Sequence, residues 1–162
     1  MTLSNLKISA NISGKVTKSP TDGSTQIDDY TESLARNTEI PSDANLLYHT
    51  KMTVTNGGSQ NIDLSGTLED ALGQSCVFSK VYAFLIVNLN TSTGNVVRVG
   101  NSNWATWLGS ATDYVVVGPK GHLCLSSPVD GYAVTASTAD ILTIANPGGT
   151  SINIRVVIVG KS

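Results

Sequence analysis

Charge is scarce in this chain of 162 residues. Lys, Arg, Asp and Glu together make up 14% of the residues, with 10 basic and 12 acidic side chains and a formal net charge of −2 at pH 7. An average soluble protein holds about 25% charged residues. The basic residues are scattered, which argues against a basic face that would neutralise nucleic-acid phosphates. So little charge suits a protein whose surface lies against other proteins, and it also occurs in many neutral β-proteins.

Long apolar runs are also missing. The longest, VYAFLIV at 81–87, fits a buried strand and is far shorter than the roughly 20 residues of a membrane-spanning helix. The first residues, MTLSNLKIS, have neither the basic start nor the apolar stretch of a signal peptide. We therefore expect a protein made in a reducing cytoplasm, with no membrane and no nucleic acid as partners.

Cysteine is limited to Cys76 and Cys124, both within apolar, strand-like runs. We expect both to be small buried residues, and a disulfide would require their strands to face each other. The metal-ligand spacings CxxC and HExxH and the loop pattern of an EF-hand are absent. The sequence therefore predicts no metal and no cofactor.

Residues with the spacing of a catalytic centre are missing as well. The two histidines, His49 and His122, lie within strand patterns, and no GxSxG motif is present. Asp113 and His122 could pair with a nearby serine only if their strands adjoin. The neighbouring carboxylates at 28–29 and 69–70 would point to opposite faces of a strand, unlike a glycosidase pair. We expect a protein that is not an enzyme.

What the sequence does contain is alternation of apolar and polar residues. This period of two, broken by Gly- and Pro-bearing turns, predicts about ten short strands and an all-β, antiparallel β-sandwich formed by a single domain, 1–162. The number of strands favours a jelly roll over an immunoglobulin-type sandwich. The expected strands are 6–13, 46–55, 60–65, 76–90, 96–100, 114–118, 122–127, 132–137, 141–146 and 151–160.

Two local features add detail to this prediction. Asn56-Gly57 is a strong type I′ turn signal, so 46–55 and 60–65 are expected to form a hairpin. The stretch 66–74 could form about one turn of helix, with Thr67 as its N-cap.

The stretch 18–45 differs from the rest because it is polar, acidic and weakly periodic. Connections longer than about 12–15 residues are generally functional or disordered. It could be an irregular meander over the sandwich, a loop with a short helix in DDYTESLAR, or an extended arm that reaches a neighbouring subunit. In the last case Ile27, Tyr30, Leu34 and Ile40 are the candidate docking residues.

Both tryptophans, Trp104 and Trp107, lie between two predicted strands. They could cap one end of the core with the indole N–H bonded to a loop carbonyl, anchor a subunit interface, or form a stacking platform for a sugar. We take both as interface candidates.

From Cys76 onward the chain resembles small virion structural proteins of tailed bacteriophages. The resemblance is carried by FSKVYAFLIVNLNTSTGNVVRVG, NSNW, DYVVVGPKG, GYAVTASTADILTIANPGG and the ending IRVVIVGKS. It differs at Gly118-Pro119-Lys120-Gly121, where the similar proteins have Pro-Gly-Gly, and it does not extend to the first 75 residues.

The resemblance implies a capsid decoration, or cement, protein with a jelly-roll or related sandwich fold. Such a protein would bind the outer surface of the phage head as a homotrimer, with the major capsid protein as its partner, and would stabilise the shell by bridging coat subunits. Its location would be the virion, after synthesis in the host bacterial cytoplasm. The alternative is a tail- or fibre-associated module that binds a receptor or glycan.

Overall fold

The chain divides into two compact units. The computed structural model describes residues 10–18, 26–34 and 41–162, with side chains described from residue 41 onward. The hairpin unit comprises Asn5–Ile40, and the second unit, called the body below, comprises Met1–Ser4 and Pro41–Ser162.

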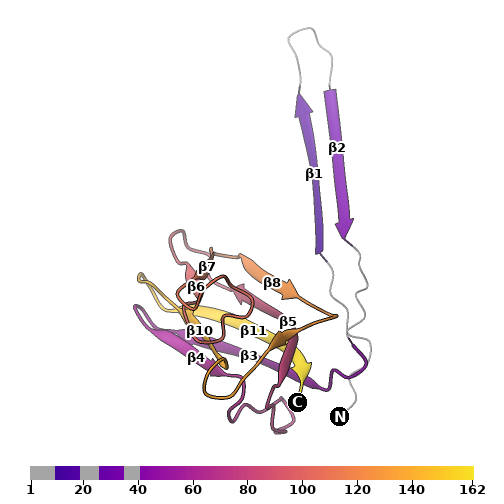
Figure 1. Cartoon of the computed structure of the whole chain (residues 1–162). Coiled ribbons are helices and arrows are strands. Elements are labelled where there is room, and N and C mark those ends of the chain that lie inside the picture. Colours follow the sequence, from indigo (N-terminus) through magenta and orange to yellow (C-terminus); the bar gives the residue numbers. More distant parts are fainter. Residues whose placement is uncertain (1–9, 19–25, 35–40) are drawn as a thin grey trace. The chain divides into compact units, whose positions relative to one another are not determined.

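The hairpin unit contains two antiparallel strands, β1 (Ala10–Lys18) and β2 (Gln26–Leu34) (Figure 1). Their register runs without a break from Ala10 opposite Leu34 to Lys18 opposite Gln26. β2 lies inside the stretch 18–45, so the short helix considered for DDYTESLAR is wrong. The strand expected at 6–13 is present as β1 from Ala10 onward, and residues 6–9 lie outside the described part of the chain.

The body consists of two antiparallel sheets, so the predicted all-β, sandwich-like fold class is confirmed (Figure 1). No helix is present in the ranges that the structure describes. The five-stranded sheet has the order β3 (Leu46–Val54), β11 (Ile152–Lys161), β5 (Lys80–Asn88), β8 (His122–Ser126), with β9 (Tyr132–Ala133) also paired to β5. The four-stranded sheet has the order β4 (Ser59–Asp63), β10 (Ile141–Ala145), β6 (Val97–Gly100), β7 (Tyr114–Val117).

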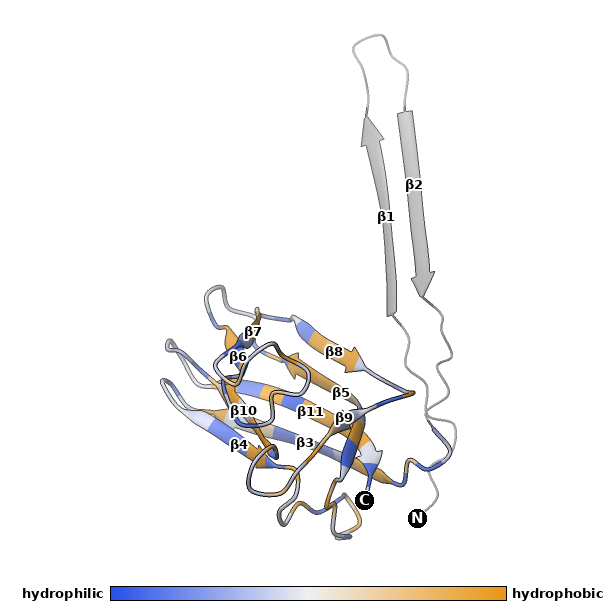
Figure 2. Cartoon of the chain, viewed as in Figure 1, coloured by the Kyte–Doolittle hydropathy of each residue, from blue (hydrophilic) through white to orange (hydrophobic). Residues whose placement is uncertain are grey.

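The core lies between these two sheets. Every second residue of the central strands is buried, as β11 illustrates with Ile152, Ile154, Val156 and Ile158, all 0% exposed. Figure 2 shows the corresponding alternation of hydrophobic and hydrophilic residues along β11. Each fully buried aliphatic side chain of this kind stabilises the fold by about 1.5–3 kcal/mol.

The predicted hairpin of 46–55 and 60–65 is wrong, and the turn between the two strands is not of type I′, because Gly57 has a positive φ and Asn56 does not. Gly57 has φ 68°, and the Gly58 N–H donates to the Thr55 carbonyl at 3.0 Å. The two strands nevertheless belong to different sheets, because β3 pairs with β11 and β4 pairs with β10. Val54 and Ile62 are both buried. The chain therefore arches across the core instead of folding back within one sheet.

Two buried asparagines stabilise further arches of this kind. Asn88 ends β5, and its side-chain amide donates to the carbonyls of Asn95 and Val117 at 2.8 and 3.2 Å. Asn146 follows β10 and donates in the same way to Val54 and Thr150 at 3.3 and 2.8 Å. Because buried polar groups need partners, each buried asparagine amide is satisfied by two backbone carbonyls and holds the ends of its arch together.

The helical turn expected at 66–74 is also wrong. The Asp70 carboxylate accepts the N–H groups of Leu72 and Gln74, both at 2.8 Å, and Glu69 bridges to Ser75 as an isolated antiparallel pair. A short acidic side chain that bonds to nearby backbone donors competes with helix formation. The segment is a tight loop, and Leu72 at its tip is 77% exposed.

Candidate interaction surface

Trp104 lies in the core and not on a surface that a partner could contact. Its side chain is 0% exposed, and the indole Nε1–H donates to the Ala133 carbonyl at 2.9 Å. This is the geometry of a core cap. The choice of Trp104 as an interface residue is therefore corrected, because a side chain without exposed surface offers a partner nothing to bind.

Trp107 packs beside it and is partly buried. Its Nε1–H donates to the Trp104 carbonyl at 3.2 Å. Phe84 lies edge-on to both indoles, with ring centroids 5.6 Å from Trp104 and 5.1 Å from Trp107, and Tyr132 completes the cluster. The two indoles thus share one aromatic cluster at the core and do not form an exposed platform for a sugar.

The other candidate residues belong to the hairpin unit. Ile27, Tyr30 and Leu34 lie in β2, whereas Ile40 is outside the described residues. Ile27 is opposite Thr17, Tyr30 opposite Gly14, and Leu34 opposite Ala10.

A buried carboxylate joins three loops of the body. Asp140 accepts hydrogen bonds from the Ser65 hydroxyl at 2.8 Å, the Ser137 N–H at 2.6 Å and the Asn103 amide at 3.0 Å. Asn103 in turn accepts the N–H groups of Asp140 and Ile141. The hydrogen bond from the Ser65 hydroxyl holds the pKa of Asp140 below its ordinary value, and the bond from the Ser137 N–H has the next largest effect. Its role is structural, since every polar contact is satisfied within the chain.

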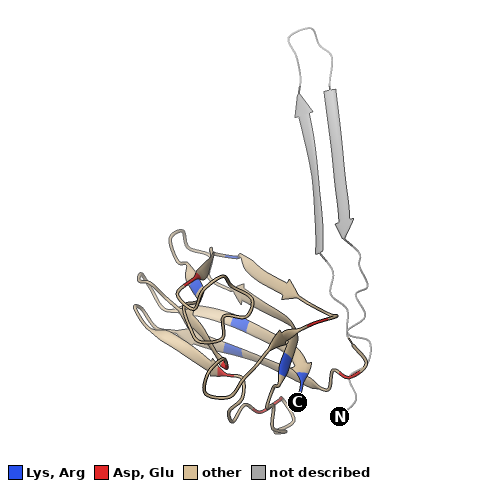
Figure 3. Cartoon of the chain, viewed as in Figure 1, with Lys and Arg blue, Asp and Glu red and all other residues tan. Residues whose placement is uncertain are grey.

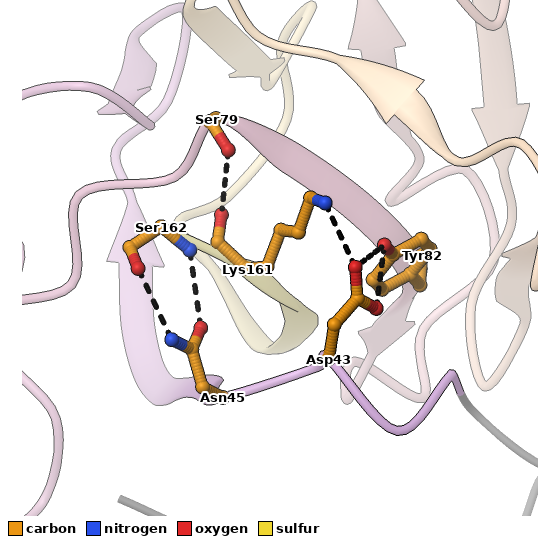
Figure 4. A network of polar contacts seen from close by, with 6 residues as sticks. All are labelled: Asp43, Asn45, Ser79, Tyr82, Lys161 and Ser162. Carbon is orange, nitrogen blue, oxygen red and sulfur yellow. Dashed lines mark hydrogen bonds and ion pairs between the residues drawn. The ribbon is translucent and has the colours of Figure 1, made fainter.

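A second polar network fastens the segment that follows residue 40 to the C-terminal strand (Figure 4). Lys161 Nζ lies 2.8 Å from Asp43 Oδ2, and the Tyr82 hydroxyl donates to the same carboxylate at 2.9 Å. Asn45 and Ser162 exchange two hydrogen bonds, each at 3.1 Å. The Lys161 ammonium, followed by the Tyr82 hydroxyl, lowers the pKa of Asp43, and Asp43 raises the pKa of Lys161.

The outward face of the five-stranded sheet is the surface with the most distinctive chemistry. We define this outer sheet face by the residues that alternate with the core residues of its four long strands: Leu47, His49, Lys51 and Thr53; Asn153, Arg155 and Val157; Leu85 and Val87; His122, Cys124 and Ser126. The aliphatic members are half-buried, and the polar members and Cys124 are exposed.

The strand register arranges these residues in rows across the sheet. One row runs Lys51, Arg155, Val87, His122, and the next runs His49, Val157, Leu85, Cys124. None of the residues that define the outer sheet face is Asp or Glu, and both histidines of the chain lie on it. Figure 3 shows the basic residues on β3 and β11 with no acidic residue on either strand. The surface therefore combines half-exposed aliphatic side chains with uncompensated positive charge.

Cys124 corrects a further expectation from the sequence. Both cysteines are free, but only Cys76 is buried, at 1% exposure, whereas Cys124 is exposed on β8. β8 is an edge strand with one face on the core, and Leu123 and Leu125 occupy that face. The alternation of the strand then places Cys124 outward.

The structure does not assemble the catalytic arrangement considered for Asp113 and His122. Asp113 precedes β7 in the four-stranded sheet, and His122 begins β8 in the other sheet. Within the described ranges, no three His, Cys, Asp or Glu residues are grouped so that they could hold a metal ion. The described part of the chain also has no helix with the length and apolar character needed to cross a membrane.

Comparison with known proteins adds little to this description. No protein family and no curated protein matches the chain. Among solved structures, one similar chain comes from the work described as "Bacillus endospore appendages form a novel family of disulfide-linked pili". It has 16% sequence identity and a TM-score of 0.38, over 71% of this chain and 88% of that chain. A likeness of this size carries no argument about function, so the proposals below rest on this chain's own residues.

Proposed function

We propose that this chain is a structural subunit of a bacteriophage virion, which decorates the capsid and stabilises it by bridging coat subunits. Three features support the proposal: the resemblance of residues 76–162 to phage virion proteins, the low content of charge, and a two-sheet body with a separate hairpin. The proposed role is one of binding, without catalysis or a cofactor. The proposed partners are the major capsid protein and further copies of the chain, arranged as a homotrimer.

The hairpin unit is the observation that carries this proposal. Among its described residues it contains only two strands, β1 and β2. A two-stranded ribbon is marginally stable by itself in water, and its two outer edges present unpaired backbone groups. Contact with another protein surface would stabilise the ribbon and would supply hydrogen-bond partners for its edges. A subunit that reaches its neighbours with such an arm, and repeats that contact over a shell, gains slow dissociation through multivalency.

The test is to locate the protein in intact particles. A cryo-EM reconstruction of the virion should show the body on the outer surface of the head, and particles that lack the protein should lose their DNA at lower temperature than complete particles. Adding the purified protein back should restore the heat resistance. Density at the tail or fibre, or absence from the particle, would contradict the proposal, and the tail location would favour the receptor-binding alternative.

A further inference from the structure

The hairpin unit has two chemically different sets of register positions. Residues that are opposite each other in an antiparallel pair, and every second residue along it, share one face of the ribbon. One set pairs Ala10 with Leu34, Ile12 with Glu32, Gly14 with Tyr30 and Val16 with Asp28. The other pairs Asn11 with Ser33, Ser13 with Thr31, Lys15 with Asp29 and Thr17 with Ile27.

The first set is apolar and acidic, and the second is mostly polar. Apart from the last pair of the register, Lys18 and Gln26, the charged residues of the first set are Asp28 and Glu32. The described residues of the hairpin unit form only these two strands, so an aliphatic and aromatic face on this ribbon needs cover from elsewhere.

The outer sheet face has the complementary chemistry. Leu47, Leu85, Val87 and Val157 leave part of their side chains exposed, and the neighbouring charges are those of Lys51 and Arg155. Lys51 is directly opposite Arg155 on adjacent strands, and like charges in this relation destabilise a sheet. A partner that supplies two carboxylates next to apolar side chains would remove that repulsion.

From this complementarity we infer that the outer sheet face is the docking site for the β1–β2 hairpin of a second copy of the chain. The apolar register set of the hairpin packs on the aliphatic residues of β11 and β5, and Asp28 and Glu32 neutralise Lys51 and Arg155. The dimensions agree, because β1, β2, β3 and β5 are each nine residues long and β11 is ten. The inference deepens the proposed function, since it rests on the self-association of the subunit and names the surfaces that meet.

Charge reversal in the full-length chain tests the inference. The variant Lys51→Glu/Arg155→Glu should weaken self-association about tenfold or more, because close charge pairs across an interface then repel. Asp28→Lys/Glu32→Lys should weaken it similarly. Combining all four substitutions should restore association to near the original level. The control Arg98→Glu reverses one exposed charge on β6, in the four-stranded sheet, and should have no effect.

Two measurements give the readout. Sedimentation velocity over a range of protein concentrations measures the association constant of each variant. The rate at which Cys124 reacts with a maleimide reports whether the outer sheet face is covered, and Cys76 contributes no background because it is buried. We expect Cys124 to react more slowly as the protein concentration rises, and this protection to disappear in either reversed variant. Thermal unfolding of each variant establishes that the body is still folded.

Each other outcome overturns the inference in a distinct way. Association that is unchanged by the reversals, or not restored by the combined variant, would show that copies meet through other surfaces. Protection of Cys124 that does not depend on concentration would assign the face to the hairpin of the same chain. If the chain stays monomeric at every concentration, the inference is wrong, and self-association is no longer part of the proposed function. The capsid location is tested separately by the reconstruction.

Discussion

The indole Nε1 of Trp104 lies 2.9 Å from the carbonyl oxygen of Ala133, and this hydrogen bond joins the loop after β6 to the short strand β9. β9 pairs with β5 in the five-stranded sheet, whereas β6 belongs to the four-stranded sheet. A single buried side chain therefore links the loop that follows a strand of one sheet to a strand of the other. Trp107 donates in turn to the backbone carbonyl of Trp104, so the two tryptophans are joined by a hydrogen bond as well as by their packing.

Removal of the Trp104 side chain should be the most destabilising of the aromatic substitutions. We expect Trp104→Ala to lower the free energy of unfolding by about 3–5 kcal/mol, because it leaves a large cavity and an unpaired carbonyl. Trp107→Ala should cost clearly less, since that indole is only partly buried. Urea denaturation followed by far-UV circular dichroism measures both values. Equal losses of unfolding free energy in the two variants would contradict the prediction, because they would show that the deeper burial of Trp104 adds nothing to its contribution.

The two buried arch asparagines give a second prediction about stability. Asn88→Ala should lower the free energy of unfolding by about 1–3 kcal/mol, because two buried carbonyls lose their donor. Asn146→Ala should cost a similar amount. Since the two residues share no partner, the double variant should show the sum to within about 0.5 kcal/mol. The exposed Asn153→Ala serves as a control with little effect on the urea midpoint.

The arches also show where prediction from sequence succeeds and where it stops. The alternation of residues predicted the position of nearly every strand in the body, because the pattern reflects a core on one side of each strand. It did not predict that β3 and β4 lie in different sheets, because the pair Asn56-Gly57 also fits the turn of an arch, in which only Gly57 has a positive φ. Pairing depends on β10 and β11, which lie far along the chain.

The candidate site was predictable to a smaller degree. The stretch 18–45 was recognised as unusual, but its polar sequence concealed β2, whose register with β1 is needed to separate the apolar positions from the polar ones. The outer sheet face was missed altogether. Lys51, Arg155, His49 and His122 are scattered in the sequence, and only the strand register brings them to one surface.

Asp140 should make the stability of the body dependent on pH in acid. Its folded pKa lies below the ordinary value of 3.8, so its contribution is fully present above that pH and is lost as the pH falls through the lowered pKa. Asp140→Asn should lower the melting temperature at neutral pH and flatten its decline in acid. The exposed Asp130→Asn is the matched control. An Asp140 variant that keeps the acid dependence of the original chain would assign that dependence to other carboxylates, first of all Asp43, whose pKa Lys161 also lowers.

The boundary between hairpin and body gives the last prediction. A chain without Asn5–Ile40 should fold to a body of nearly unchanged melting temperature, because Asn5–Ile40 forms a compact unit of its own and the described residues of the core cluster lie in the body. The same chain should lose self-association in sedimentation velocity. A deletion of 18–45 should behave differently and lower the melting temperature, because it also removes the buried Ala44, the Asp43–Lys161 ion pair and the bonds between Asn45 and Ser162. If both deletions unfold the body, the hairpin is part of its structure and not an arm for a neighbour.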